Sequence, residues 1–94
     1  MKPETTLWDP TARLENLDAQ QAYLEAAFED GDPALITAAI GDVAKARGMT
    51  QIALDAGISR ETMYKAFQAN GNPTLATLTG VVKALGMKLS LSPV

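Results

Sequence analysis

The sequence predicts an all-α domain of five helices that contains a helix-turn-helix and ends in a short β-strand. Three observations lead to this prediction: apolar residues recur at intervals of three and four, glycines follow such runs, and the last residues alternate between apolar and polar. The chain has 94 residues, of which 47% are hydrophobic, enough for one core but not for a second domain. We therefore expect an N-terminal arm over residues 1–16 and a single domain over residues 17–94.

The arm is interrupted by Pro3 and by the pair Asp9-Pro10, which prevent a long helix. Leu7 and Trp8 are large apolar side chains next to each other. An arm of this kind is ordered only when such side chains dock, either on the core of the same chain or on a partner. The sequence leaves both possibilities open.

Two helices are expected after the arm. Asp18 and Gln21 resemble a capping box, so the first helix should begin at Asp18 and end before Gly31. Asp32 and Pro33 then serve as the N-cap and the first helical residue of the second helix, since proline fits the first turn of a helix. Each helix carries an apolar stripe and is therefore expected to bury one face.

Residues 49–69 predict a helix-turn-helix, which follows the expected end of the second helix at Gly48. Ala53 is small at the place where two short helices would touch, and Gly57 occupies the position where the turn needs a left-handed residue. Ser59 would cap the second of these helices. The same geometry also occurs in ordinary helical bundles, so the spacing alone leaves a purely structural role open.

The chain after this unit predicts a fifth helix and a strand. Thr74 would cap a helix that ends at Gly86. Residues 87–92 alternate strictly between apolar and polar side chains, which is typical of a strand. Because a lone strand leaves its backbone groups unpaired, it must pair with the N-terminal arm or with a second copy of itself, and we expect the second copy.

The composition removes most catalytic and metal-binding chemistry. The chain has no cysteine and no histidine, so it lacks disulfides, thiolate metal ligands and the commonest general base. No apolar run reaches the roughly 20 residues of a membrane span, and the first residues lack the apolar core of a signal peptide. We expect a cytoplasmic protein that is not an enzyme and that uses no cofactor or metal.

The net charge of −3 hides a strong asymmetry along the chain. Residues 1–40 carry eight acidic and two basic side chains, whereas residues 41–94 carry three acidic and six basic ones. A basic half that contains a helix-turn-helix favours phosphate as a partner, and an acidic half favours a cationic partner. The alternative is that the acidic residues only form a solvated face.

The polar residues of the helix-turn-helix provide the chemical groups that a sequence-specific DNA-binding protein needs. Arg60 lies in the first turn of the second helix and is the best candidate to contact a base, while Lys65 would contact a base or a phosphate. The N–H groups at the start of the first helix favour a phosphate. The candidate DNA-binding residues are Thr50, Gln51, Ser59, Arg60, Glu61, Tyr64, Lys65 and Gln68.

Several motifs between Ala39 and Ser92 form a specific combination. They are Gly-Asp-Val-Ala-Lys-Ala-Arg-Gly-Met-Thr-Gln-Ile-Ala, Gly-Ile-Ser-Arg-Glu, Tyr-Lys-Ala-Phe, Gly-Asn-Pro-Thr and Lys-Ala-Leu-Gly-Met-Lys-Leu, preceded by Ala-Tyr-Leu-Glu-Ala-Ala-Phe-Glu-Asp-Gly-Asp-Pro. With these motifs the chain resembles the addiction-module antidote proteins, small HigA-like antitoxins of the Xre, or phage-repressor-like, helix-turn-helix superfamily. The superfamily usually has a glutamine where this chain has Met49, so the contact made from that position is not carried over.

The resemblance implies a partner and two activities. Antitoxins of this type are encoded beside a small, usually basic toxin of the RelE/ParE fold, block it by direct binding, and repress the shared operon through the helix-turn-helix. The residues expected to face the toxin are Tyr23, Glu25, Glu29, Asp30 and Asp32. Two alternatives stay open: a stand-alone transcriptional regulator of a phage or mobile element, and an adaptor that has lost DNA binding.

Overall fold

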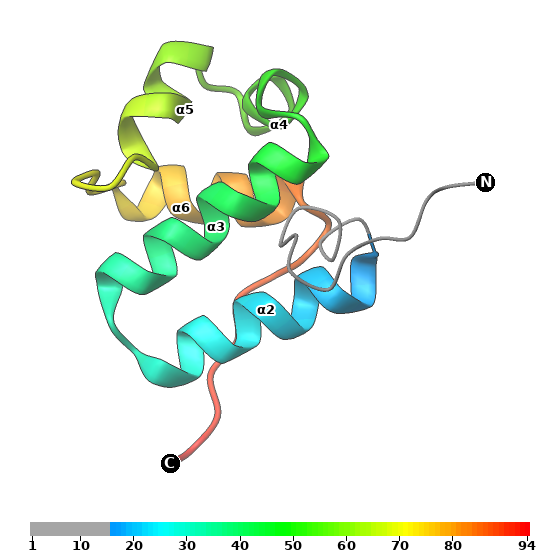
Figure 1. Cartoon of the computed structure of the whole chain (residues 1–94), viewed down its shortest axis with the longest axis vertical. Coiled ribbons are helices and arrows are strands. Elements are labelled where there is room, and N and C mark those ends of the chain that lie inside the picture. The colour runs from blue at the N-terminus through cyan, green and yellow to red at the C-terminus, as the bar shows by residue number, and fades with distance from the viewer. Residues whose placement is uncertain (1–15) are drawn as a thin grey trace, which may run out of the picture.

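The computed structural model describes residues 16–94, which form five α-helices joined by short connections (Figure 1). The helices are α2 (Leu17–Asp30), α3 (Pro33–Arg47), α4 (Met49–Ala56), α5 (Arg60–Ala66) and α6 (Leu75–Ala84). The all-α prediction is therefore confirmed for the described part of the chain. The predicted N-terminal arm lies outside the described residues, apart from Asn16.

α2 begins earlier than the sequence predicted. The side chain of Asn16 accepts hydrogen bonds from the backbone N–H groups of Asp18 (2.7 Å) and Ala19 (3.1 Å) and so acts as the N-cap. The predicted capping box is wrong, because the upstream asparagine supplies the cap and Asp18 falls inside the first turn. Its carboxylate is still favourable there, at the positive end of the helix dipole. Gln21 instead donates to the Glu25 carboxylate at 3.4 Å.

The three other predicted side-chain caps are confirmed. In each case a side-chain oxygen accepts from a backbone N–H group in the first turn of the helix, which satisfies a donor that has no partner within the helix. The pairs are Asp32 with Ala34 (3.0 Å), Ser59 with Thr62 (3.0 Å) and Thr74 with Thr77 (3.1 Å).

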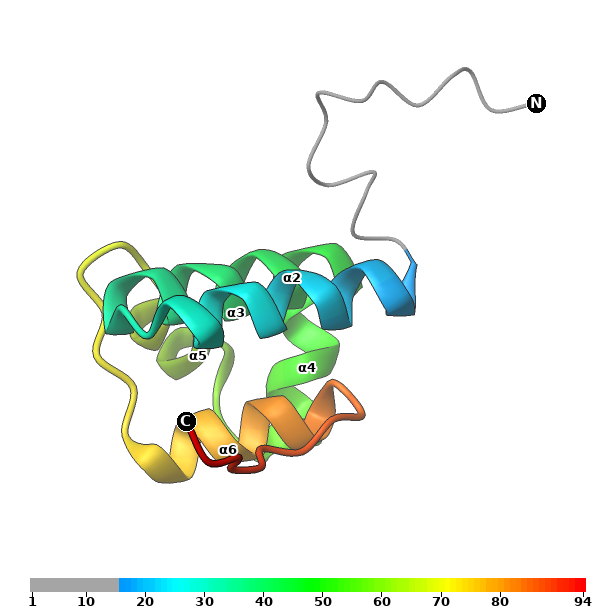
Figure 2. The same ribbon diagram turned by 90° about the horizontal axis from the view of Figure 1, so that it is seen from below.

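The core receives buried apolar side chains from all five described helices. α2 and α3 lie side by side and run in opposite directions, joined by a turn at Gly31 whose φ is 83° (Figures 1 and 2). α4 packs against both α3 and α6. The largest fully buried apolar side chains come from these elements and are Ile40, Val43, Met63, Val81 and Leu85.

A partly buried polar contact joins three parts of the fold. Arg47, in the last turn of α3, donates to the Gln20 side-chain oxygen on α2 at 2.9 Å and to the backbone oxygen of Leu85, after α6, at 3.2 Å. Gln20 is only 1% exposed. A charged donor that satisfies two acceptors holds these segments in a defined register.

Replacing Arg47 by methionine is expected to lower the free energy of unfolding by about 1.5–3 kcal/mol, because both hydrogen bonds to a charged donor are lost while the apolar part of the side chain is kept. Urea denaturation measures this change. The matched control is Lys45→Met, an exposed cation on the same helix, which should change stability by less than about 0.5 kcal/mol. Equal effects of the two substitutions would contradict this role of Arg47.

α5 ends at Ala66, three residues earlier than expected. Phe67 is nearly fully buried, and its backbone oxygen lies so close to α3 that a Cβ atom at Gly41 would come within 3.0 Å of it. The chain then turns so tightly that a Cβ atom at Gly71 would collide with the Ala66 carbonyl oxygen. α5 thus stops where Phe67 packs against α3 and the chain turns at Gly71, and the local sequence does not specify the packing against α3.

The strand expected over residues 87–92 is not formed in the single chain. Met87 donates its N–H group to the Val82 carbonyl at 3.1 Å, and beyond it no backbone hydrogen bond joins residues 88–94 to the rest of the described chain. A strand needs a neighbouring edge, and residues 16–94 of one copy offer none.

Within residues 16–94, no helix is both long and apolar enough to cross a membrane. In the same range, acidic side chains do not gather in groups of three or more that could hold a metal ion.

Candidate functional site

The outer face of α5 and the start of α4 present polar side chains to solvent. Met63 is fully buried and Phe67 nearly so, which fixes the inner face of α5 against the core. The residues predicted to bind DNA lie on the opposite side or at the helix ends. All eight are exposed: Thr50, Gln51, Ser59, Arg60, Glu61, Tyr64, Lys65 and Gln68.

Arg60 and Tyr64 form a defined pair on this face. The central guanidinium carbon of Arg60 lies 5.3 Å from the centre of the Tyr64 ring, one turn further along α5. This cation–π contact orients the guanidinium without using its N–H donors, which can then meet a phosphate or the two acceptors on the edge of a guanine. Lys65 adds a second cation, whereas Glu61 places a carboxylate beside them.

Two of the predicted contacts are placed less favourably. The Ser59 hydroxyl accepts from the Thr62 N–H group at 3.0 Å and donates to the Thr62 hydroxyl at 2.8 Å, so its main role is to start the helix. Gln68 lies beyond the end of α5. The exposed face of α5 is therefore formed by the candidate residues between Ser59 and Gln68.

α4 begins differently from the other described helices. Its N-cap is Gly48, and no side chain accepts from its first N–H groups, whereas side chains cap the other four. These backbone donors and the helix dipole are suited to an anion, and the exposed Thr50 lies beside them. Gln51 donates to the Asp55 carboxylate at 2.9 Å, so its side-chain amide is already engaged.

α2 provides a surface of opposite charge. The helix contains four acidic residues and no lysine or arginine. Glu25 and Glu29 are four residues apart and therefore share one face of the helix. Asp32 also accepts from the backbone of α3 as its N-cap. The predicted toxin-facing residues are all exposed: Tyr23, Glu25, Glu29, Asp30 and Asp32.

Tyr23 differs from these carboxylates because its hydroxyl has a partner in the fold. The hydroxyl donates to the Asp42 carboxylate at 2.7 Å and thereby links α2 to α3. This hydrogen bond, then burial, then the negative charge of Asp42 raise the pKa of Tyr23 to about 12. Sequence reasoning did not identify Asp42, since it lies 19 residues away on another helix and no local pattern relates it to Tyr23.

Replacing Tyr23 by phenylalanine is expected to lower the free energy of unfolding by about 0.5–1.5 kcal/mol at neutral pH, because one hydrogen bond is lost. The folded-state pKa lies above the ordinary value of 10.0, so the contribution is fully present below about pH 10 and is lost as the pH rises to about 12. Urea unfolding at stepwise pH should therefore show a difference between the two proteins that is constant up to about pH 10 and then shrinks. A difference that persists unchanged to about pH 12 would contradict this account.

The acidic face of α2 and the outer face of α5 lie at opposite ends of the molecule. Figure 1 is drawn with the longest axis vertical and shows α2 at one end and α5 at the other, with α3 between them. The two faces are therefore separated by the body of the domain.

Comparison with known proteins adds a family to this geometry. Residues 4–93 match the sequence model of a family described as "Probable addiction module antidote protein". An uncharacterized protein of Haemophilus influenzae is 44% identical over 84 residues, which cover 89% of this chain and 87% of the relative. No solved structure matches the chain. The family match includes both the acidic face and the outer face of α5.

Proposed function

We propose that this chain, which belongs to the addiction module antidote family, is the antitoxin of a type II module that both neutralises its toxin and represses its own operon. An antidote implies a cognate toxin, and we expect that toxin to have the RelE/ParE fold. The observation that carries the proposal is the position of an acidic face on α2 and a cation-bearing face on α5 at opposite ends of one small domain (Figure 1). Such a domain can bind two different partners at once.

In this proposal α4, the turn at Gly57 and α5 form a phage-repressor-like helix-turn-helix of the Xre, HigA-like type. Gly57 has a φ of 76°, which supports the tight turn between the two short helices. α5 is the recognition helix: Arg60, in its first turn, contacts a base edge, and Lys65 contacts a phosphate. The uncapped start of α4 binds a second phosphate.

The toxin is proposed to bind at α2. The helix has four carboxylates and no cation, so a small basic protein is attracted to it by complementary charge. Glu25 and Glu29 form the centre of this face, with Asp30 and Asp32 at its end. Tyr23 contributes the exposed part of its ring, since its hydroxyl is held by Asp42.

Two copies are proposed to pair through the tail over residues 87–92. The tail has an open backbone edge in the single chain, and an antiparallel pair across a two-fold axis would satisfy it. α5 carries only two cations, so one copy binds DNA weakly. In a dimer the two recognition helices would lie about 34 Å apart, the length of one turn of the duplex, and would contact two half-sites. Because the two copies are joined, the dimer binds DNA more tightly than one copy does.

A stand-alone transcriptional regulator is the second candidate, because the face of α5 does not by itself require a toxin. In either role we propose a cytoplasmic protein with no catalytic step and no metal or cofactor. The neighbouring reading frame distinguishes the two, since an antitoxin gene lies beside a gene for a small basic protein.

Co-expression with the product of the neighbouring gene tests the proposal. We expect the two proteins to co-purify as a complex and the antitoxin to restore growth of cells that express the toxin. A variant with Glu25→Lys and Glu29→Lys serves as the matched negative control in both assays. If neither co-purification nor rescue occurs with the unmodified chain, the antitoxin role is wrong and only the regulator is left.

A further inference from the structure

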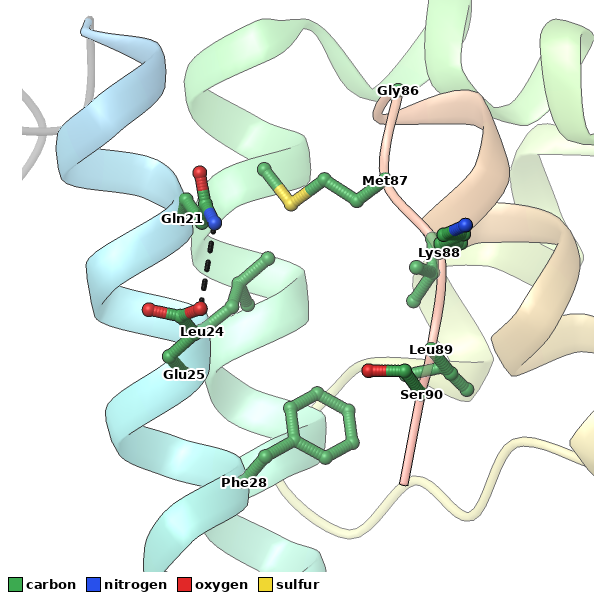
Figure 3. A pocket seen from close by; sticks show the side chains of 10 residues that line it. Gln21, Leu24, Glu25, Phe28, Gly86, Met87, Lys88, Leu89 and Ser90 are labelled. Atoms are coloured by element: carbon green, nitrogen blue, oxygen red, sulfur yellow. Dashed lines mark hydrogen bonds between the residues drawn. The ribbon is translucent and has the colours of Figure 1, made fainter. Parts of the chain in front are cut away.

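A groove separates α2 from the tail that follows α6 (Figure 3). Its volume is about 490 Å³. Leu24 and Phe28 on α2 and Met87 on the tail point into it (Figure 3), and Leu89 also lines it. The groove is therefore mainly apolar, with the hydrogen-bonded pair Gln21 and Glu25 along one side.

Part of this apolar lining is in contact with water. Leu89 is 40% exposed, and Phe28 and Met87 are half-buried. Water against such a concave apolar surface is released when an apolar segment binds, which favours binding. The tail also offers unpaired backbone groups beyond Met87, so an extended segment can both fill the groove and form backbone hydrogen bonds.

We propose that the N-terminal arm of the same chain occupies this groove, with Leu7 and Trp8 as its apolar anchors. The arm leads directly into Asn16, the N-cap of the helix that forms one wall of the groove. Trp8 is eight residues before Asn16, and eight residues of extended chain reach roughly 26 Å. Leu24 is eight residues into the helix, only about 12 Å along its axis. The arm is therefore long enough to fold back over α2.

The sequence of the arm suits this position. Asp9-Pro10 favours a change of chain direction just after the two anchors. The four residues Thr5-Thr6-Leu7-Trp8 are uncharged and favour extended backbone, so they can lie beside the open edge of the tail. The family match begins at residue 4, so these residues are part of the matched length.

Tethering selects the arm over other occupants. A segment linked to the groove by a short flexible chain has an effective concentration in the millimolar range, which a second copy or a separate partner does not reach at ordinary protein concentrations. The arm would use the edge of the tail that faces α2, so the other edge stays open to a second copy. The proposal does not depend on toxin or DNA binding.

Trp8 is the single tryptophan of the chain, so its fluorescence reports the arm directly in the full-length protein. We expect its emission in the folded protein to lie at shorter wavelength than in urea, with several-fold weaker quenching by iodide. Leu89→Asp should move the emission to longer wavelength and increase quenching. Leu54→Asp, an exposed change on α4 outside the groove, should leave both unchanged, with circular dichroism confirming that each variant is folded.

A cross-link identifies where the arm lies and to which copy it belongs. The chain has no cysteine, so the variant with Thr6→Cys and Ser90→Cys has one possible pair; Ser90 points into the groove (Figure 3). We expect mild oxidation to give a disulfide within one chain. The control pair is Thr6→Cys and Tyr64→Cys. Tyr64 lies on α5, at the far end of the molecule (Figure 1), so this pair should give no disulfide within one chain. Solvent-like Trp8 emission, absence of the disulfide, or a disulfide that links two chains would each overturn the proposal.

Discussion

Replacing Arg60 by alanine will weaken binding to the DNA upstream of this gene by about 5- to 150-fold, because an arginine contact to a base contributes roughly 1–3 kcal/mol. The structure gives a reason to expect the upper part of this range. Tyr64 holds the guanidinium at 5.3 Å from its ring, so little side-chain entropy is lost when the arginine binds. Titration of labelled operator DNA at fixed salt measures the change.

Salt dependence separates base reading from phosphate contact. Lys65→Ala should weaken binding to operator and to unrelated DNA alike and should reduce the slope of log affinity against log salt by about 1. Arg60→Ala should instead reduce the preference for operator. The control is Lys83→Ala, which removes the same charge from the last turn of α6 and should change affinity less than about twofold. No binding by the unmodified protein at low salt would rule out both DNA-binding candidates.

Reversing the charge of Glu25 and Glu29 together will weaken toxin binding by about 100-fold or more. Both side chains are exposed on one face of a helix that has no cation, and placing lysines against a basic partner replaces attraction with repulsion, which costs several kcal/mol. Calorimetry with the purified toxin measures the loss. The same variant should retain its affinity for operator DNA, because α2 lies at the far end of the molecule from α5 (Figure 1).

The matched control changes the net charge by the same amount at the other end of the domain. Asp55→Lys with Glu61→Lys converts two exposed carboxylates of α4 and α5, and it should leave toxin affinity within about threefold of the original at physiological salt. If both double variants lose toxin binding equally, the toxin responds to total charge and not to the face of α2.

The helix starts could be predicted because capping depends on neighbouring residues. Ser59 and Thr74 each bond an N–H group three positions ahead, so the local sequence is sufficient. The start of α2 shows where this reasoning fails. Asn16 and Asp18 are both good caps only two residues apart, and the sequence alone did not show that Asn16 takes the role.

Features that depend on distant residues could not be predicted. α5 ends just before Phe67, whose backbone lies against Gly41 of α3, far away in the sequence. Arg47 and Gln20, and Tyr23 and Asp42, pair across 27 and 19 residues of chain. To form a strand, the tail over residues 87–92 needs a neighbouring strand to pair with, and residues 16–94 of one copy do not provide one. The exposure of the candidate binding residues could be predicted, because they are the residues that the apolar pattern leaves out of the core; their role in binding stays a prediction.

The positions of the two faces fit the two activities that we propose for this domain, toxin binding at α2 and operator binding at α5. Because α2 and α5 lie on opposite sides of α3 (Figure 1), we expect toxin bound at α2 to leave the outer face of α5 open to DNA. Bound toxin would instead enlarge the repressor on its operator. The two affinities should therefore be separable by mutation.

A gel-shift titration with operator DNA, antitoxin and toxin in one series tests this claim most directly. We expect toxin to retard the antitoxin–operator band further. Glu25→Lys with Glu29→Lys should keep the first shift and lose the second, and Arg60→Ala should need a higher protein concentration for the first shift while still binding toxin in solution. Toxin that displaces the unmodified antitoxin from the operator at every ratio, or one set of substitutions that abolishes both operator binding and toxin binding in solution while the protein stays folded, would contradict the separation of the two faces.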